Sequence, residues 1–288
     1  MINGVEIYIK REDKIHPDVS GNKFRKLKYN LLGISDNQSV LTFGGAYSNH
    51  IVATAKACQM LNIKAIGVIR GDELGKDLAQ TLAQNHSLKT ASDAGMQLHF
   101  VSRQDYRLKE EMPFVRDLIK KNKLQLIPEG GTNPKAILGC REILTGKDRD
   151  FDYITCALGT AGTFSGLLEA AWPFQHLIGF PALKGDFFKN EINKYTQRTN
   201  FTLQTQYHFG GYAKYTMALI DFINWFKKTY EVQLDPIYTG KMMYGLFEMI
   251  KTNQFPKNTR ILAVHTGGLQ GIDGFNAKLR LKSKHELI

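Results

Sequence analysis

Short apolar runs alternate with segments of helical periodicity along most of the chain. Strands are predicted at seven runs: Val40–Phe43, Ala65–Ile69, Leu98–Val101, Leu124–Ile127, Tyr153–Leu158, Leu177–Phe180 and Arg260–His265. Between them, apolar residues at helical spacing predict helices over Ile51–Leu61, Phe114–Ile119, Ala136–Ile143 and Phe164–Ala171. Alternating strands and helices are typical of parallel sheets with crossover helices, so the pattern predicts an α/β protein.

Domain boundaries have to be inferred from the order of these elements, because no Pro/Ser-rich linker and no repeat is visible. The charged segment Gly146–Asp152 and the polar stretch Ser35–Ser39 are the two candidate boundaries. They predict a larger domain of residues 1–36 plus 146–288 and a smaller inserted α/β domain of residues 37–145.

The formal net charge of +11 raises the question of a polyanionic partner. The lysines are scattered, however, and their densest groups lack interleaved aromatic residues in any recognisable nucleic-acid-binding pattern. No apolar run approaches the roughly 20 residues that a membrane span needs. We therefore expect no nucleic-acid partner and no membrane insertion.

The three cysteines, Cys58, Cys140 and Cys156, are far apart and have no C-x-x-C spacing. They predict buried apolar side chains, and no metal site is expected. The start of the chain lacks the apolar segment of a secretory signal, with Arg11, Asp13 and Lys14 following at once. These features predict a reducing, cytoplasmic location.

The first candidate for chemistry is Lys23, in the segment Ser20–Leu27. Ser20 is a plausible helix cap and Gly33 a plausible stop, which puts Lys23 in the first turn of a helix. The helix dipole disfavours a cation there, so the amine would be more readily neutral and nucleophilic. An ordinary exposed lysine in a basic helix is the alternative.

A second cluster follows the strand at Val40–Phe43, where Gly44 and Gly45 precede Ser48, Asn49 and His50. A turn from a parallel strand into a helix lies at the sheet edge where α/β proteins bind ligands, and its free N–H groups attract a carboxylate. Simple capping of the helix by Ser48 or Asn49 is the alternative.

A third cluster follows the strand at Tyr153–Leu158 and runs through Gly159, Thr160, Ala161, Gly162 and Thr163 into a helix. Glycines free the backbone to wrap an anion, and the threonines add hydroxyl donors at a helix N-terminus. The pattern predicts a phosphate site, with a plain tight turn as the alternative. No Walker motif is present, which disfavours a nucleoside triphosphate.

Two further segments lie near the C-terminus. Asp235–Lys241 precedes a helix and contains Tyr238, which offers a ring face or a phenol. His265–Gly268 follows the last strand, and Thr266 would offer a neutral hydroxyl to a ring nitrogen. Each alone is a weak signal, because a tyrosine at a helix start often only packs.

Together these segments resemble the fold type II pyridoxal-phosphate enzymes, and specifically the family of D-cysteine desulfhydrase and 1-aminocyclopropane-1-carboxylate (ACC) deaminase. The similarity covers nearly the whole chain, although Ala161 stands where glycine is usual and residues 82–96 depart from the family pattern. The resemblance implies a tryptophan synthase β-like fold with two three-layer α/β domains, mostly parallel sheets and the cofactor between them. It also implies a small amino-acid substrate and a homodimer.

The resemblance also implies roles for individual residues. Lys23 would carry pyridoxal 5'-phosphate as a Schiff base and move the Cα proton of the substrate. Ser48, Asn49 and His50 would hold the substrate carboxylate, and Asn49 also the oxygen on the cofactor ring. Tyr238 would stack on or reach the ring. The remaining cofactor contacts are assigned to Asn22, Gly159, Thr160, Ala161, Gly162, Thr163 and Thr266. Tyr212, in the family-like segment Gly210–Lys214, would contact the substrate near the reacting bond. The resemblance implies that the catalytic residues are Lys23, Ser48, Tyr212 and Tyr238.

Three positions separate the branches of this family. ACC deaminases resemble one another in carrying Gln, Glu and Leu where this chain has His50, Thr239 and Thr266. The chain therefore resembles the desulfhydrase branch, which implies β-elimination from an amino acid such as D-cysteine. ACC deamination, or another small amino-acid lyase activity, is the alternative, followed by a non-catalytic protein that binds the cofactor.

Overall fold

The computed structural model describes residues 2–35, 37–122 and 124–288 and contains nine named strands in that part of the chain. Asp36, at a predicted domain boundary, and Met1 lie outside the described residues. The strands are β1 (Glu6–Arg11), β2 (Ser39–Gly45), β3 (Lys64–Arg70), β4 (Gln97–Val101), β5 (Leu124–Ile127), β6 (Tyr153–Leu158), β7 (His176–Pro181), β8 (Phe201–Leu203) and β9 (Arg260–His265).

The α-helices connect these strands and cover both sheets. They are α1 (Asn22–Leu31), α2 (Asn49–Met60), α3 (Leu78–Gln84), α4 (His86–Asp93), α5 (Pro113–Asn122), α6 (Pro134–Arg141), α7 (Gly162–Ala170), α8 (Phe188–Asn193), α9 (Met217–Tyr230), α10 (Thr239–Lys251) and α11 (Ile272–Arg280).

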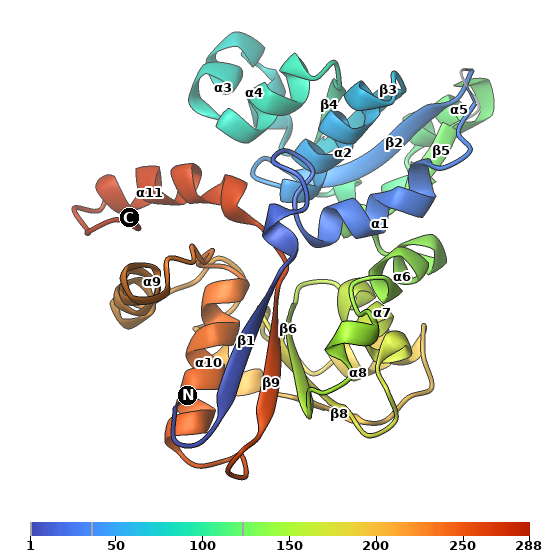
Figure 1. The fold of residues 1–288 in the computed structure, drawn as a ribbon. Coiled ribbons are helices and arrows are strands. Elements are labelled where there is room, and N and C mark those ends of the chain that lie inside the picture. The colour runs from blue at the N-terminus through green and yellow to red at the C-terminus, as the bar shows by residue number, and fades with distance from the viewer. Residues whose placement is uncertain (1, 36, 123) are drawn as a thin grey trace.

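Two parallel sheets organise the chain, and Figure 1 shows them one above the other with α1 and α6 between. The larger sheet has the order β1-β9-β6-β7-β8 and the smaller sheet the order β4-β3-β2-β5. All the pairings between these strands are parallel. The α/β class with parallel sheets predicted from the sequence is therefore confirmed.

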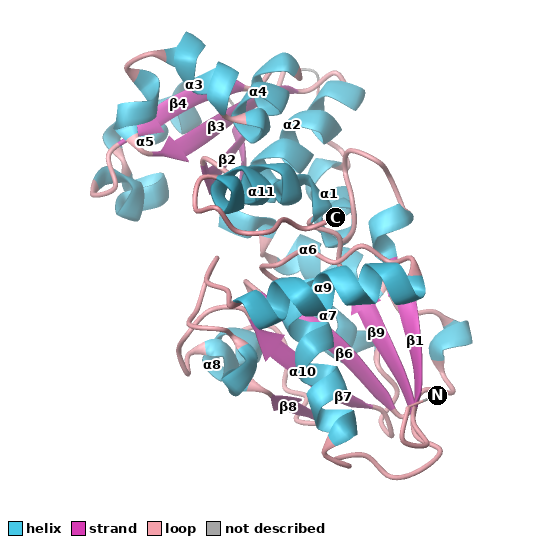
Figure 2. Cartoon of the chain, turned by 90° about the vertical axis from the view of Figure 1, so that its left-hand side faces the viewer, coloured by secondary structure: helices cyan, strands magenta, loops and turns pink. Residues whose placement is uncertain are grey.

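Helices cover both faces of each sheet, which gives three layers twice. On the larger sheet, α9 and α10 pack against one face around Ile223, Leu246 and Ala263, as Figure 2 shows. The other face packs against α7. The smaller sheet has α2 and α4 on one face, and Tyr106, Met112 and the helix α5 on the other. Burial of these apolar faces provides the main driving force for the fold.

Helix α1 contacts both sheets. Its apolar side chains Leu27 and Leu31 share a core with Val40 of β2 and Ile51 of α2. Its first backbone N–H, from Asn22, donates to the carbonyl oxygen of Thr266 just after β9, at 3.1 Å. The two sheets are thus connected through the helix that carries Lys23.

Most predicted elements are present with nearly the predicted bounds. Strands β5, β6 and β9 match the predicted runs residue by residue, and the three cysteines are fully buried, as expected. The apolar pattern missed β1, whose residues are all partly exposed or exposed at the sheet edge, and β8, which has three residues. It also missed α3 and α4, which cover the divergent segment 82–96, and α8, α9 and α11.

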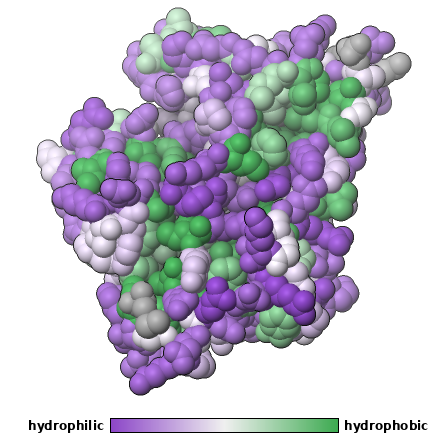
Figure 3. Space-filling view, in the orientation of Figure 1, coloured by the Kyte–Doolittle hydropathy of each residue, from purple (hydrophilic) through white to green (hydrophobic). Residues whose placement is uncertain are grey.

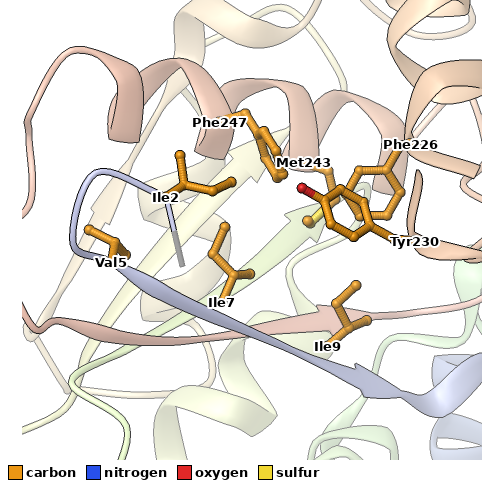
Figure 4. Close-up of a pocket in the computed structure, with 8 residues that line it drawn as sticks. All are labelled: Ile2, Val5, Ile7, Ile9, Phe226, Tyr230, Met243 and Phe247. Carbon is orange, nitrogen blue, oxygen red and sulfur yellow. The ribbon is translucent and has the colours of Figure 1, made fainter.

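The molecular surface is mostly polar. On the face in Figure 3, hydrophobic side chains gather at the upper right, where Figure 1 shows α1, β2 and β5. An apolar pocket lies elsewhere, between β1, α9 and α10, and is lined by Ile7, Ile9, Phe226, Tyr230, Met243 and Phe247 (Figure 4). None of the helices described is long and apolar enough to cross a membrane.

Candidate functional site

The predicted site residues come together where the strands of the two sheets end. Ser48 and Asn49 follow β2, Gly159–Thr163 follow β6, and Thr266 follows β9. The carboxyl ends of parallel strands meet at one edge of each sheet, and the two edges face α1. Topology alone therefore brings together segments that are more than 200 residues apart.

Lys23 is the second residue of α1, in the first turn as predicted. The predicted cap is wrong, because Ser20 does not cap α1: its hydroxyl donates to the carbonyl oxygen of Asp13, and the residue before the helix is Gly21 at φ 62°. A Cβ on Gly21 would lie 2.0 Å from the oxygen of Thr266, so only glycine fits between α1 and the end of β9. This contact holds Lys23 at the end of the larger sheet.

The amine of Lys23 is readily neutral. Burial, followed by the positive charge of Lys26 one turn away, lowers the pKa of Lys23 to about 7. The sequence analysis expected a neutral amine from the helix dipole; desolvation is the larger cause here. The amine donates to Asn22 Oδ1 at 3.1 Å, and Asn22 Nδ2 donates to Thr163 Oγ1 at 2.8 Å. Lys23 therefore lies beside the turn between β6 and α7.

That turn is also held by Lys26, a residue that the sequence analysis did not single out. Its side chain is 1% exposed, and Nζ donates to Gly130 O, Thr132 Oγ1 and Thr160 Oγ1, each at 3.0 Å. Helix α7 starts at Gly162 without a side-chain cap. A lysine side chain, threonine hydroxyls and a helix N-terminus are the features that bind a phosphate group.

The turn between β2 and α2 is the third part of the site. Ser48 is the N-cap of α2, and its Oγ accepts from the N–H of Ile51 at 3.4 Å. The capping interpretation of Ser48 is thus correct, and its hydroxyl hydrogen remains able to donate to a ligand. Asn49 Nδ2 donates to the carbonyl oxygen of Gly268 at 3.3 Å, which joins this turn to the segment after β9.

The imidazole of His50 lies in the interior, 2% exposed. Thr42 Oγ1 donates to Ile127 O and lies 2.8 Å from His50 Nε2, so Nε2 carries the proton and Nδ1 is an acceptor. Burial, then the charges of Lys23 and Lys26, keep the pKa of His50 well below its usual value. His50 is therefore a neutral residue beside two lysines.

Tyr238 is fixed by the acid three residues before it. Asp235 is 2% exposed; its Oδ1 accepts from the N–H of Ile237 and of Tyr238, and its Oδ2 from the N–H and hydroxyl of Thr239. The Tyr238 ring lies against Gly159, where an added Cβ would be 2.8 Å from Cε1. Burial raises the pKa of Tyr238 well above its usual value, so the phenol stays protonated.

Tyr212 is 50% exposed, and its ring centroid lies 6.3 Å from that of Tyr238, nearly edge-on. It therefore lies at the outer side of the same site. Thr266 is 7% exposed and contacts α1 through its carbonyl oxygen, which accepts from Asn22.

The arrangement fits a ligand that combines an aldehyde with a phosphate group. A neutral lysine is what an aldehyde needs, and the turn beside it is suited to an anion. Among the described residues, Asn49 Oδ1 and His50 Nδ1 are buried without a hydrogen-bond partner. Buried polar atoms normally have partners, so these two atoms at the start of α2, where His50 feels the charge of Lys23, indicate that a bound group completes the site.

Two residues of this site, Lys26 and Asp235, were not predicted as site residues from the sequence. Lys26 lies three residues after Lys23 and thus on the same face of α1, but a lysine in a basic helix is usually solvated. Asp235 precedes a proline at a helix start, which is typical of a capping acid. Its four hydrogen bonds could be found only from the fold.

Comparison with known sequences gives a consistent result. A sequence model of a family described as "Pyridoxal-phosphate dependent enzyme" matches residues 2–267. The "Putative 1-aminocyclopropane-1-carboxylate deaminase" of Pyrococcus horikoshii is 30% identical, over 96% of this chain and 88% of its own length. The "Bifunctional D-cysteine desulfhydrase/1-aminocyclopropane-1-carboxylate deaminase, mitochondrial" of Arabidopsis thaliana is 30% identical, over 94% of this chain and 74% of its own.

Among solved structures, one described as an "ACC deaminase homologue" superposes with a TM-score of 0.78 at 28% identity. The match covers 97% of this chain and 89% of that one. The likeness extends over both sheets and the site between them.

Proposed function

Because the chain belongs to the pyridoxal-phosphate dependent enzymes, in the D-cysteine desulfhydrase and ACC deaminase family, we propose that it eliminates the β-substituent of a small amino acid. The proposed substrate is D-cysteine. With one water it gives a keto acid (pyruvate), ammonia and hydrogen sulfide, which balances all atoms. The observation that carries this proposal is the placement of Lys23, whose pKa burial lowers to about 7, beside the β6–α7 turn.

Pyridoxal phosphate supplies an electron sink that accepts the pair left when the Cα proton departs. In this chain Lys23 would hold the cofactor covalently and, once released, carry the Cα proton. A pKa of about 7 suits both tasks, because the amine gains and loses a proton near neutral pH.

The phosphate group would bind at Gly159–Thr163, where backbone N–H groups and the hydroxyls of Thr160 and Thr163 converge at the start of α7. Lys26, which donates to the hydroxyl of Thr160, would supply a positive charge near the phosphate group. Asn22 donates to Thr163 of the same turn. Lys23, which would hold the cofactor covalently, is therefore connected by hydrogen bonds to the turn that would bind its phosphate group.

The substrate carboxylate would bind at the N-terminus of α2. Ser48 retains a hydroxyl donor, and the first N–H groups of the helix face the same side. Asn49 would reach the oxygen on the cofactor ring. His50 would accept a hydrogen bond from the bound group through Nδ1, because its Nε2 is already hydrogen-bonded to Thr42.

The two tyrosines would define the side of the site where the bond breaks. Tyr238 packs on Gly159 and keeps its proton, so it can donate to a leaving group or contact the cofactor ring. Tyr212, further out, would contact the substrate. Thr266 would offer a neutral hydroxyl to the ring nitrogen, which leaves the nitrogen unprotonated and favours elimination over transamination.

The choice of D-cysteine rests on the three branch positions. His50, Thr239 and Thr266 stand where ACC deaminases of the family resemble one another in carrying Gln, Glu and Leu. Position 239 has no carboxyl group here, and in the structure the hydroxyl of Thr239 donates to Asp235 Oδ2 at 2.6 Å. ACC deamination, which the names of two relatives favour, is the second candidate.

We also propose the wider organisation that the family resemblance implies. Residues 1–36 plus 146–288 would form the larger domain and residues 37–145 the inserted one, with the smaller sheet wholly within the latter. A homodimer is supported by exposed large apolar side chains such as Leu32, Leu138 and Phe174. Three free buried cysteines support a cytoplasmic setting, and we propose that no nucleic acid or membrane is a partner. Size-exclusion chromatography tests the dimer.

Borohydride reduction of the purified yellow protein, followed by peptide mapping, tests the cofactor assignment. We expect the pyridoxyl label on Lys23, its loss in K23A, and its retention in K28A, which changes an exposed lysine of the same helix. Label on another lysine would contradict the assignment.

Incubation with D-cysteine, L-cysteine, D-serine, L-serine and ACC in turn, with assays for keto acid and sulfide, tests the substrate. We expect the highest kcat/KM with D-cysteine. Product from ACC alone would overturn the branch assignment, and no keto acid from any of them would leave a binding protein.

A further inference from the structure

We propose that Lys241 is a positioning residue for Tyr212: from α10 it holds the backbone loop that presents Tyr212 to the site. The inference rests on the proposed function for its activity readout, and it adds a residue that neither binds the cofactor nor touches the substrate. It starts from a buried lysine that the proposed chemistry does not use.

Lys241 is 1% exposed, and its Nζ donates to two backbone carbonyl groups, His208 O at 2.9 Å and Gly211 O at 2.8 Å. Both oxygens also accept from within the loop, from the N–H of Gly211 and of Lys214. The ammonium group thus lies at the centre of the turn that precedes Tyr212. Hydrogen bonds from a charged donor are stronger than neutral ones, which makes this an effective clamp.

The loop needs such a clamp because its backbone is strained. Four of its residues have positive φ, and two of them, Phe209 at 54° and Ala213 at 55°, are not glycine. Conformations of this kind persist where surrounding contacts determine them. Helix α10 supplies other contacts as well: Tyr207 packs on Gly245, and the ring of Phe209 meets Tyr244 edge-on at 5.0 Å.

Lys241 also connects the two tyrosines of the site. It lies three residues after Tyr238, in the first turn of α10. Burial lowers the pKa of Lys241 to about 8, and the carboxylate of Asp235 counteracts this shift, so the amine is mostly charged at neutral pH. Asp235 fixes Tyr238 through backbone N–H groups, while Lys241 fixes the carbonyl group next to Tyr212. One helix start therefore sets the placement of both rings.

The spacing of the rings, with centroids 6.3 Å apart, follows from this arrangement. Because Tyr212 is half exposed, its placement depends on the loop backbone as well as on its edge-on contact with Tyr238. A change at Lys241 should therefore alter the position of Tyr212 and spare attachment of the cofactor, because Lys23 and the turn Gly159–Thr163 lie on other elements.

The test uses the full-length, cofactor-loaded protein and compares K241M with K251M. Lys251 is an exposed lysine of the same helix, paired with Glu248. We expect K241M to lower kcat for D-cysteine roughly ten- to hundredfold with KM changed less than about threefold, and to retain the cofactor. Amide hydrogen exchange in residues 209–213 should accelerate about tenfold in K241M and remain unchanged in K251M.

A double-mutant cycle with Y212F separates positioning from a general structural role. If Lys241 acts through Tyr212, the losses overlap, and Y212F/K241M is about as active as Y212F alone. Additive losses, or loop exchange in K241M equal to that of the wild type, would overturn the inference. If K241M does not fold, K241Q replaces it, with an uncharged side chain that is one atom shorter.

Failure of the proposed function has a different signature. Wild-type protein that forms no keto acid from any amino acid would contradict the activity, while the hydrogen-exchange comparison still decides whether Lys241 holds the loop. Active wild type with an unaffected K241M would instead reject the inference alone.

Discussion

Asn22 and Thr163 join the start of α1 to the start of α7 through a side-chain hydrogen bond of 2.8 Å. The adjacent residue, Lys23, donates to the other end of the same Asn22 amide. The lysine amine and the glycine-threonine turn are thereby held at a fixed separation by one side chain. Under the proposed function, this side chain would couple attachment of the cofactor at Lys23 to binding of its phosphate group at the turn.

The rate of cofactor uptake by the apoprotein should follow the titration of Lys23. An aldehyde reacts with the neutral amine, whose fraction rises with pH and is one half near pH 7, because burial and Lys26 lower this pKa from 10.5 to about 7. Uptake followed by absorbance should therefore rise about tenfold from pH 6 to pH 8 and then level off. A rise that continues to pH 10 would indicate an unperturbed lysine.

Replacement of Lys26 by methionine should weaken cofactor binding. The change removes the amino group of Lys26 and with it the hydrogen bonds to Gly130 O, Thr132 Oγ1 and Thr160 Oγ1. Loss of charge-assisted hydrogen bonds of this kind costs about 1.5–3 kcal/mol, so the Kd should rise roughly ten- to hundredfold by equilibrium dialysis.

The same variant should shift the uptake profile to higher pH, because removal of a like charge raises the pKa of Lys23. K28M is the matched control, since Lys28 is an exposed residue of the same helix paired with Glu142. Equal affinities in K26M and K28M would show that Lys26 does not serve the anion site.

Alanine at Gly21 should destabilise the fold far more than alanine at Gly33. Both glycines have positive φ, at 62° and 78°, but a Cβ at Gly33 meets nothing within 4 Å, whereas at Gly21 it collides with Thr266 O. We expect a loss of about 1 kcal/mol in G33A from backbone strain alone, and at least about 3 kcal/mol in G21A. Denaturant unfolding measures both, and equal losses would mean that the close approach of α1 and β9 is relaxed.

The fold was predictable to the extent that burial leaves a pattern. Strand β6 is buried on both faces and reads as a continuous apolar run, while the edge strand β1 is partly exposed throughout and does not. Lys23 could be found because a glycine, a helix start and a lysine coincide in sequence. Lys26 and Lys241 could not, because a lysine has the same sequence signature whether it is solvated or buried among carbonyl groups.

The two lysines of α1 differ in how their nitrogen atoms are used. Lys26 Nζ has three partners at 3.0 Å, the carbonyl oxygen of Gly130 and the hydroxyls of Thr132 and Thr160, while burial lowers the pKa of Lys26 as well. Lys23 has one hydrogen bond, to Asn22. A reagent that reaches the start of α1 therefore displaces fewer hydrogen bonds at Lys23 than at Lys26, so carbonyl reagents should modify the apoprotein at Lys23 in preference to its neighbour one turn along.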